Sequence, residues 1–346
     1  MWDPRNYRDT DFGLNADDTF EPSDAADWGD VDLNLPHIMT VLGPIHPDGL
    51  GTCLHHEHIL SDPAALTAQD PAYRLDRIDL AAEELESFYT VGGRSMVDMS
   101  SLDYGRDLMG LRTIALRVPI NIIAVAGRHV HLHASRMNGA LDGGALEAEI
   151  EADVNGEFKP GVMTFGTSFG EVTPVEAIAA RTVARAAVVS GYPVSTHTTA
   201  GTMAHEQLDL VENEGLDPAR IIIGHLDQRL DAAYLLNVAR RGAWLSFDHI
   251  ANERSGNDAS KAAMLVHLAH AGYGAQLLIS QGLQRTSDLI AYGGGGGWIH
   301  LLERFTIELM EAGAEAELVR TLLVDNPARA LAIVPPHTDC RATPRL

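Results

Sequence analysis

Residues 54–59 read Leu-His-His-Glu-His-Ile and continue an apolar run that begins at Gly51. This pattern predicts the end of a β-strand, in which side chains alternate between the two faces. His56 and His58 are two residues apart, so both imidazoles are expected on the same face. Two neutral imidazoles on one face make half of a transition-metal site, and the rest of the chain decides whether that site is completed.

Short apolar segments alternate with amphipathic helical patterns from Gly51 to about residue 333. Segments this apolar are typical of strands that are buried on both faces, in a parallel sheet covered by helices. Eight such units in series predict a distorted (β/α)8 TIM barrel, and a doubly wound open sheet is the alternative. The predicted strands are 51–59, 94–99, 121–126, 161–167, 193–197, 221–225, 243–249 and 276–280, preceded by a short strand and turn at 38–45. The predicted helices are 77–91, 107–117, 142–154, 174–190, 203–214, 231–241, 258–272 and a final helical region at 298–333.

The position of the glycine-rich segment favours the barrel. A doubly wound sheet usually has glycines in the turn after its first strand, whereas the glycine run at 293–297 follows the last predicted strand. We interpret this run as a flexible loop over the barrel mouth. A phosphate-binding loop is less consistent with the sequence, because no Lys-Ser or Lys-Thr pair follows the glycines.

The length of 346 residues fits one barrel domain with short extensions. Residues 1–36 are rich in Asp, Asn and Pro and poor in aliphatic side chains, so this acidic segment is not expected to fold alone. It is either a flexible tail or an arm that wraps a neighbouring subunit. The catalytic barrel is expected over residues 37–334, and a short C-terminal tail over residues 335–346.

The formal net charge of −23 argues against binding to nucleic acids or to anionic membrane surfaces. The two cysteines, Cys53 and Cys340, imply no disulfide framework and fit a reducing compartment. The N-terminus lacks the pattern of a signal peptide, and no segment is long and apolar enough for a membrane span. We therefore expect a cytoplasmic protein that acts on a small molecule.

Polar residues gather where the predicted strands end, which is where barrel enzymes build their active sites. Four of them are histidines at the ends of strands one, five and six, a pattern that predicts a metal site of the kind zinc prefers. The residues at these strand ends are His56, His58, Asp98, Arg128, His129, Thr164, Thr167, His197, His225, Asp248, His249, Ser280 and Gly282.

An ordered series of motifs over residues 38–333 resembles the phosphotriesterase family of the amidohydrolase superfamily. The series includes the segments 40–45, 56–58, 193–198, 247–250 and 326–329. This resemblance implies a metal centre that activates water for hydrolysis of phosphoesters, lactones, carboxylic esters or amides. Members of the family often form dimers, so a homodimer is an expectation of the same kind.

The resemblance also implies roles for single residues. His56 and His58 would bind one metal ion, and His197 and His225 would bind a second. In the family, a carboxylated lysine or a glutamate on strand four bridges the two ions. An aspartate at the end of strand eight binds the first ion and accepts a proton from the attacking water.

This chain departs from the family pattern at both acidic positions: the bridging position falls on Thr164 and the aspartate position on Gly282. Two dications held close together repel strongly without negative charge between them. We therefore predict a mononuclear zinc site, formed by His56 and His58 with one of His197 or His225. The candidates to replace the missing proton acceptor are His249, Asp248 and Glu171.

The segment after strand three contains alternating histidines, His129, His131 and His133. If the segment is extended, these side chains share a face and supply a metal ligand, a general base or a substrate contact. The alternative interpretation is a polar surface loop. Further candidate substrate-binding residues stand in this segment and in the loop after strand eight, and they would suit a small aromatic or anionic molecule: Arg128, His129, Arg285, Tyr292 and Trp298.

Three functions remain open on the sequence alone. The first is a metal-dependent hydrolase of a small ester, lactone or phosphoester, working at a reduced histidine site. The second is a lyase that cleaves a C–C or C–O bond by histidine acid–base chemistry, which the loss of the aspartate would suit. The third is a catalytically silent homologue.

Overall fold

The computed structural model describes residues 31–136, 142–157, 159–252 and 256–336. Eight parallel strands lie side by side in chain order, which confirms the predicted barrel and excludes the open-sheet alternative. The strands are β3 (Cys53–Glu57), β4 (Ser95–Asp98), β5 (Asn121–Gly127), β6 (Val162–Thr167), β7 (Val194–Thr198), β8 (Ile221–Ile223), β9 (Trp244–Phe247) and β10 (Leu277–Ile279). Most of the predicted N-terminal arm and most of the C-terminal tail lie outside the described residues.

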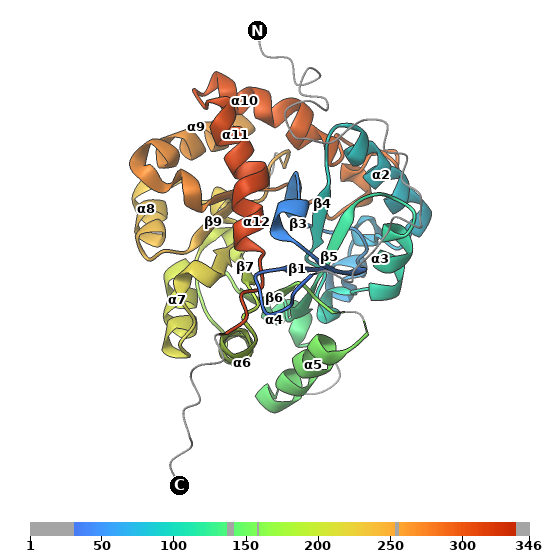
Figure 1. The fold of residues 1–346 in the computed structure, drawn as a ribbon, viewed down its shortest axis with the longest axis vertical. Coiled ribbons are helices and arrows are strands. Elements are labelled where there is room, and N and C mark those ends of the chain that lie inside the picture. Colours follow the sequence, from blue (N-terminus) through green and yellow to red (C-terminus); the bar gives the residue numbers. More distant parts are fainter. Residues whose placement is uncertain (1–30, 137–141, 158, 253–255, 337–346) are drawn as a thin grey trace.

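Helices surround the strands on the outside of the barrel (Figure 1). They are α1 (Ala64–Thr67), α2 (Ile78–Thr90), α3 (Leu108–Ala115), α4 (His131–Ala134), α5 (Gly143–Asn155), α6 (Pro174–Ser190), α7 (Ala204–Asn213), α8 (Ala232–Arg240), α9 (Asp258–Leu268), α10 (Thr306–Glu311), α11 (Ala316–Arg320) and α12 (Asn326–Ala330). Local sequence sets their ends. Helix α6, for example, begins at a capping box of Thr173 and Glu176 and ends before Gly191, whose φ of 76° suits a residue without Cβ.

The apolar side chains form two layers. One layer fills the inside of the barrel and includes Cys53, Val97, Ile123, Val162 and Ile222. The other lies between the strands and the surrounding helices. Burial on both faces explains why the strands read as continuous apolar runs in the sequence.

The hydrogen-bonded strand order ends at β10 on one side and at β3 on the other. Among the described residues no strand ladder joins these two, and single hydrogen bonds close the barrel instead. The Gly282 amide donates to the His56 carbonyl oxygen at 3.0 Å, and the His56 amide donates to Ser280 Oγ at 3.1 Å. This seam therefore passes beside the predicted metal-binding residues.

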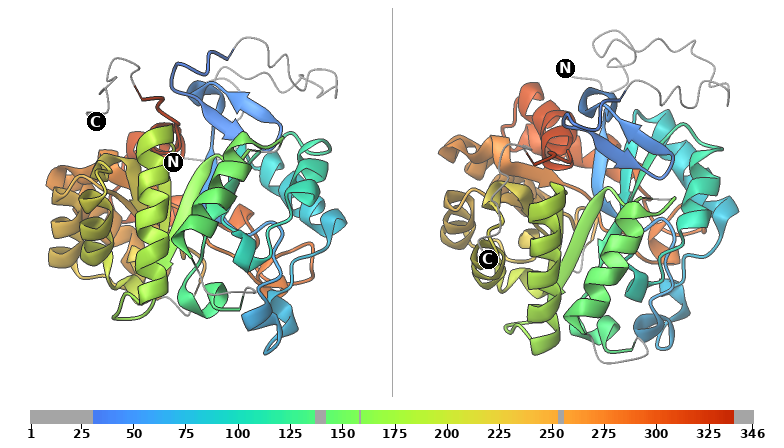
Figure 2. Two further views of the ribbon diagram at one scale, coloured as in Figure 1. Left: turned by 90° about the horizontal axis from the view of Figure 1, so that it is seen from below. Right: turned by 60° about the horizontal axis from the view of Figure 1, so that its bottom comes forward.

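Two local predictions need correction. The stretch 38–45, predicted as a short strand ending in a turn, continues after that turn into a second strand and forms an antiparallel hairpin, β1 (Ile38–Thr40) and β2 (Gly43–Ile45), which lies across one end of the barrel (Figure 2). The glycine run at 293–297 is not a loose loop over the barrel mouth. Its amides donate to Ile290, Leu289, Ser287 and Asp288 carbonyl oxygens, so it forms a series of tight turns.

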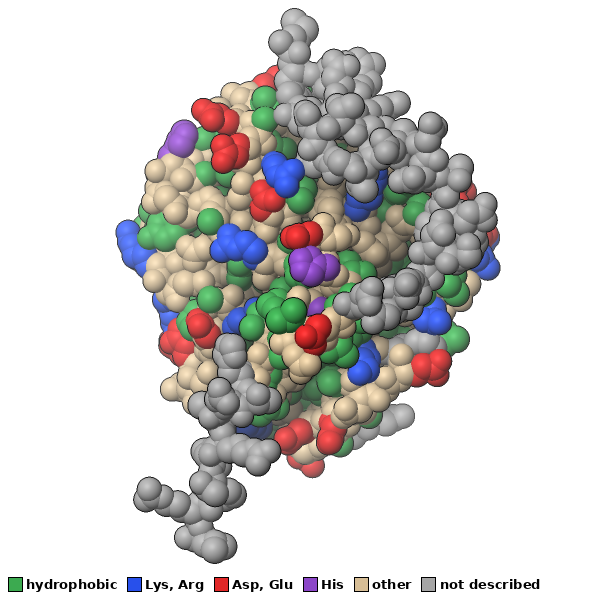
Figure 3. Space-filling view, in the orientation of Figure 1, with side chains coloured by type: hydrophobic (Ala, Val, Ile, Leu, Met, Phe, Trp, Pro, Cys, Tyr) green, Lys and Arg blue, Asp and Glu red, His purple; other side chains and the backbone are tan. Residues whose placement is uncertain are grey.

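Within the described part of the chain, no helix is long and apolar enough to cross a membrane. On the face drawn in Figure 3, acidic and basic side chains are interspersed and neither sign forms a continuous patch.

Candidate active site

A cavity of about 380 Å³ opens at the carboxyl ends of the strands. Its polar wall consists mainly of imidazole, amide and hydroxyl groups, and its apolar wall comes from leucines, a valine and a phenylalanine. The lining residues are His56, His58, Leu66, Tyr104, His129, Val130, Leu132, His133, Ser168, Phe169, His197, Thr199, His225, Gln228, His249, Gly282 and Gln284. None of these described lining residues is Asp, Glu, Lys or Arg, so the wall carries a formal charge only where an imidazole is protonated.

The four histidines predicted to bind metal all line this cavity. The ring centroids of His56 and His225 are 4.8 Å apart, and those of His197 and His225 are 4.2 Å apart. His58 lies 6.3 Å from His56, as two residues of one strand end should. Barrel closure thus brings together side chains that are up to 169 positions apart in the sequence, from His56 to His225.

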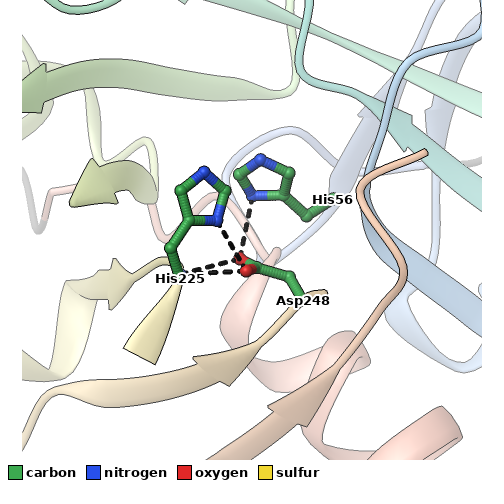
Figure 4. Close-up of side chains that lie close together, drawn as sticks. All are labelled: His56, His225 and Asp248. Carbon is green, nitrogen blue, oxygen red and sulfur yellow. Dashed lines mark hydrogen bonds and ion pairs between the residues drawn. The ribbon is translucent and has the colours of Figure 1, made fainter. Parts of the chain in front are cut away.

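Asp248 is the charged group at the centre of this cluster (Figure 4). Its side chain is fully buried, and its Oδ1 accepts a hydrogen bond of 2.6 Å from His225 Nδ1. Its Oδ2 lies 3.2 Å from His56 Nδ1. The other ring nitrogen of each histidine faces away from the carboxylate in Figure 4. Burial would raise the pKa of Asp248, but the nearby His225 and His56 hold it well below its usual value.

Three of the four imidazoles have one nitrogen hydrogen-bonded within the protein. Asp248 bonds His225 Nδ1, and Ser100 Oγ lies 3.0 Å from His58 Nδ1. His56 Nδ1 lies 3.2 Å from Asp248 Oδ2 but has no hydrogen-bond partner. His197 is reversed, because its Nε2 lies 3.2 Å from Thr199 Oγ1.

The Thr199 contact fixes the tautomer of His197. The hydroxyl of Thr199 already donates its hydrogen to the Thr167 carbonyl oxygen, so His197 Nε2 must donate to Thr199 and Nδ1 carries the lone pair. Metal-binding histidines are commonly oriented in this way by a partner on the second nitrogen. Of the four histidines, His56 and His225 are the pair with ring nitrogens inside one compact group of potential ligand atoms, so these two are placed best for a shared metal ion.

Burial keeps His56, His58 and His197 neutral, which is the form that binds metal. It lowers the pKa of His58 to about 3, and it lowers the pKa of His56 and of His197 well below the ordinary value. Protons therefore compete weakly for these nitrogens at neutral pH.

Asp248 also belongs to two compact groups of potential ligand atoms. One consists of His56, His225 and Asp248, and the other of Asp227, Asp248 and His249, with all ligand atoms of a group within 4.8 Å of one another. Since Nδ1 of His56 and of His225 face Asp248 and their Nε2 atoms face away from it, we interpret Asp248 as the partner of the ligands rather than as a ligand. It supplies negative charge close to the histidines, in a chain that has lost both acidic family positions.

His249 lines the cavity next to this cluster. Its Nδ1 lies 3.2 Å from Asp248 and 3.4 Å from Asp227, and its Nε2 lies 3.0 Å from the Gln228 amide nitrogen. Burial alone would lower the pKa of His249, but hydrogen bonds and charge from the two aspartates raise it to about 9. With its pKa raised to about 9, His249 carries a proton at neutral pH at the cavity wall.

Thr164 and Gly282, the residues predicted to stand at the family's two acidic positions, differ in their surroundings. Thr164 is buried in β6, opposite Gly127 and Ser195, and does not line the cavity. Gly282 does line it, but with a φ of 57° and with the Asp248 carbonyl oxygen only 2.7 Å from where a Cβ would stand. The backbone after β10 is therefore shaped for glycine, and an aspartate would not fit without a shift.

The structure places most of the predicted substrate contacts elsewhere. Arg128 forms an ion pair with Glu149, and Arg285 pairs with Asp70, so both guanidinium groups serve the protein itself. Glu171 is exposed outside the cavity wall. The two aromatic residues also bond within the protein: the Tyr292 hydroxyl donates to the Arg77 carbonyl oxygen, and the fully buried Trp298 donates to Glu57.

The alternating histidines do not form an extended segment, because His131 begins the short helix α4. The helical turn brings His129 and His133 into the cavity wall and leaves His131 exposed. Of the five predicted substrate contacts, His129 alone lines the cavity. The sequence pattern gives no role to four further lining residues, because each lies in a loop or a short 3-10 turn whose path depends on the fold: Tyr104, Gln228, Gln284 and Ser168.

A sequence model of the Phosphotriesterase family matches residues 36–331. A relative from Escherichia coli (strain K12), named phosphotriesterase homology protein, is 30% identical over 288 residues, which cover 82% of this chain and 98% of the relative. A phospho-furanose lactonase from Mycoplasmopsis synoviae (strain 53) is 27% identical and covers 85% of this chain and 91% of its own length. The crystal structure of a lactonase from Listeria monocytogenes matches with a TM-score of 0.81 and 29% identity, covering 86% of this chain and 99% of that chain.

Proposed function

The chain belongs to the phosphotriesterase family, and we propose that it hydrolyses a small uncharged lactone or carboxylic ester with one zinc ion held by His56, His58 and one of His197 or His225, which leaves a position for water. It is a hydrolase, in keeping with relatives that are named as lactonases. The observation that supports the metal site is that the four imidazoles line one cavity, where His225 bonds Asp248 through Nδ1 and keeps its Nε2 lone pair free for an ion.

When bound, the ion supplies water activation at neutral pH and polarises the bond that is cleaved. The chain's own residues hold and orient the reactants around it. Asp248 fixes the rings of His56 and His225, and His249 exchanges a proton with the reacting groups through the nitrogen that faces Gln228. The apolar side chains Leu66, Leu132 and Phe169 receive the rest of the substrate.

One ion is favoured over two. A pair of dications needs negative charge between them, and Thr164 and Gly282 supply none at the positions that the family uses. Asp248 is a single carboxylate, and it is already bonded to His225 and close to His56. Imidazole nitrogens favour zinc or a neighbouring first-row ion.

The lining of the cavity supports an uncharged substrate, because the proton that His249 carries is balanced by Asp227 and Asp248. Phosphate groups are usually held by Arg or Lys, and none of the described lining residues is either. Arg128 and Arg285, the nearest cations suggested by the sequence, are paired with Glu149 and Asp70. Of the substrate classes that the family resemblance implies, lactones and carboxylic esters therefore suit this cavity better than phosphoesters.

Metal analysis and turnover assays on the full-length chain, purified without chelators, test the proposal. We expect about one zinc ion per chain, hydrolysis of δ-valerolactone or phenyl acetate, loss of both after chelation, and recovery on adding zinc. His225→Ala should lose zinc and turnover, whereas His270→Ala, at an exposed position outside the cavity, should keep both.

Two results would contradict the proposal. Turnover by a chain that never contains metal would support the lyase or another metal-independent reaction. Bound zinc without hydrolysis of any lactone or ester would favour a binding protein.

A further inference from the structure

Strand β3 has an irregularity that changes the side chains it presents. Its pairing with β4 shifts register between Leu54 and Glu57. In a regular strand, His55 and His56 would face opposite sides. Here both contact the end of β9: His55 Nε2 lies 2.7 Å from Ser246 Oγ, and His56 Nδ1 lies 3.2 Å from Asp248 Oδ2. A bulge of this kind is a common way to re-aim a side chain near a site.

The contacts of His55 form the outer end of a buried chain of hydrogen bonds. Its Nδ1 lies 3.1 Å from the Ile279 carbonyl oxygen in β10, across the seam of the barrel. Its Nε2 contacts Ser246 Oγ, and that hydroxyl donates to Asp248 Oδ2 at 2.5 Å. Asp248 then contacts His56 and His225 through its two oxygens. His55, Ser246 and Asp248 are all fully buried.

This series of contacts restricts rotation of the Asp248 carboxylate, which would disturb the site. The carboxylate torsion of an aspartate is broad and roughly two-fold, so Asp248 needs contacts on both oxygens to hold one orientation. The His225 side chain and amide hold Oδ1, and Ser246 holds Oδ2. Ser246 is itself held by His55, because the Ser246 hydroxyl gives its hydrogen to Asp248 and therefore accepts from His55 Nε2.

We propose that His55 and Ser246 are positioning residues for the metal site: they fix the carboxylate of Asp248 and, through it, the ring orientations of His56 and His225. The inference rests on the proposed function in one respect, which is that these two histidines bind an ion. Neither His55 nor Ser246 lines the cavity, so neither touches the substrate.

Zinc affinity of the full-length chain, measured by competition with a chromogenic chelator, is the first test. We expect Ser246→Ala to weaken zinc binding about 10- to 100-fold, the usual effect of losing a partner of a metal ligand. His55→Leu should act similarly. The double variant should bind zinc no more weakly than the single variant with the lower affinity, because both changes break the same series of contacts. Ser246→Thr keeps the hydroxyl and should restore most of the affinity.

Ser195→Ala is a matched control. Ser195 is also a fully buried serine of the barrel, in strand β7, which β8 separates from β9, but its hydroxyl has no hydrogen-bond partner in the described structure. Its removal should leave zinc affinity unchanged. The contrast between the two serines separates a positioning role from a general effect of removing a buried hydroxyl.

Imidazole nitrogen NMR of the metal-free chain gives a second readout that needs neither zinc nor turnover. The parent and Ser195→Ala should show His225 protonated at Nδ1 alone, and Ser246→Ala should show a mixture of tautomers. Unchanged zinc affinity together with an unchanged His225 spectrum in Ser246→Ala would overturn the inference and leave the proposed function standing. If the parent binds no zinc but Ser246→Ala still alters the His225 spectrum, the proposed function fails and the positioning role is supported.

Discussion

At the scale of single residues, Gly282 decides what the end of β10 can do. A Cβ there would stand 2.7 Å from the Asp248 carbonyl oxygen, on a backbone with a φ of 57°. Left-handed backbone costs a residue with a Cβ about 1–2 kcal/mol, and a forced contact with backbone adds about 1–3 kcal/mol. We therefore expect Gly282→Ala to lower the free energy of unfolding by roughly 3 kcal/mol, measured by urea denaturation, and to weaken zinc binding because it displaces Asp248.

Gly293→Ala separates the cost of left-handed backbone from the cost of the steric contact. Gly293 has a φ of 79°, but nothing lies within 4 Å of its would-be Cβ, so this variant should lose the backbone term alone. Equal losses in the two variants would mean that the contact with Asp248 relaxes freely. In that case Gly282→Asp, combined with Thr164→Lys, would be a sound way to rebuild the family's acidic positions.

His133 links a buried ring to the pH dependence of stability. Burial, with a smaller effect of Arg136, lowers the pKa of His133 from its ordinary value of 6.5 to about 4. Between these two pKa values His133 is protonated in the unfolded chain but not in the folded one. Stability therefore rises with pH, and it is lost as the pH falls from 6.5 towards 4. Because Nδ1 of His133 is buried without a partner, His133→Phe removes no hydrogen bond there.

We expect the metal-free parent to lose about 2 kcal/mol more stability than His133→Phe between pH 7 and pH 5, in urea titrations at each pH. His131→Ala, at an exposed position of the same helix, should follow the parent. A parent and a His133→Phe variant with parallel pH profiles would show that His133 takes up its proton in the folded state as easily as in the unfolded one.

At the scale of elements, Glu57 replaces the missing ladder between β3 and β10. Its carboxylate accepts hydrogen bonds from Ser280 Oγ, from the amides of Gln281 and Leu283, and from Trp298 Nε1. Burial outweighs these bonds and raises the pKa of Glu57 to about 7. The side chain thus joins the strand of His56 and His58 to the loop that carries Gly282.

Glu57→Gln should open this seam, because the NH2 of the new amide would meet the N–H and O–H donors that now bond to the carboxylate. We expect a loss of about 2–4 kcal/mol in unfolding free energy and faster hydrogen exchange at the Gln281 and Leu283 amides. Glu83→Gln, at an exposed position of α2, is the control for charge removal. Unchanged exchange at these two amides would show that other contacts close the barrel.

The same seam shows what the sequence could and could not predict. The strands were predictable because burial on both faces leaves apolar runs, and His56, His58, His197 and His225 were predictable because each follows such a run. The bulge in β3 was not, since Leu-His-His-Glu-His fits a regular strand equally well. The partner of His55, Ile279, is 224 positions away, and only the closed barrel brings the two together.

At the scale of the whole molecule, charged side chains were the least predictable. Two arginines predicted to contact the substrate form ion pairs within the protein instead, Arg128 with Glu149 and Arg285 with Asp70. The acidic Glu57 likewise accepts the hydrogen bond of Trp298. Asp248 was one candidate among three for a proton acceptor, and its central place follows from where β9 ends relative to β3 and β8. A one-dimensional pattern predicts which residues reach the barrel mouth, whereas the packing of eight strands decides which of them meet.

The net charge of −23 surrounds a cavity whose described lining residues include no Asp, Glu, Lys or Arg, and this combination predicts a salt dependence that differs between substrates. An anionic lactone is repelled on approach, whereas a neutral one is not. Raising the ionic strength from about 0.01 M to about 0.15 M shortens the screening length from about 30 Å to about 8 Å, which removes most of the long-range repulsion. We expect kcat/KM for 5-oxotetrahydrofuran-2-carboxylate to rise several-fold over this range and kcat/KM for δ-valerolactone to stay constant. A rise for both lactones would show that salt acts on the fold or on zinc binding, and a higher kcat/KM for the anionic lactone at low salt would mean that a cation of the protein does reach the substrate.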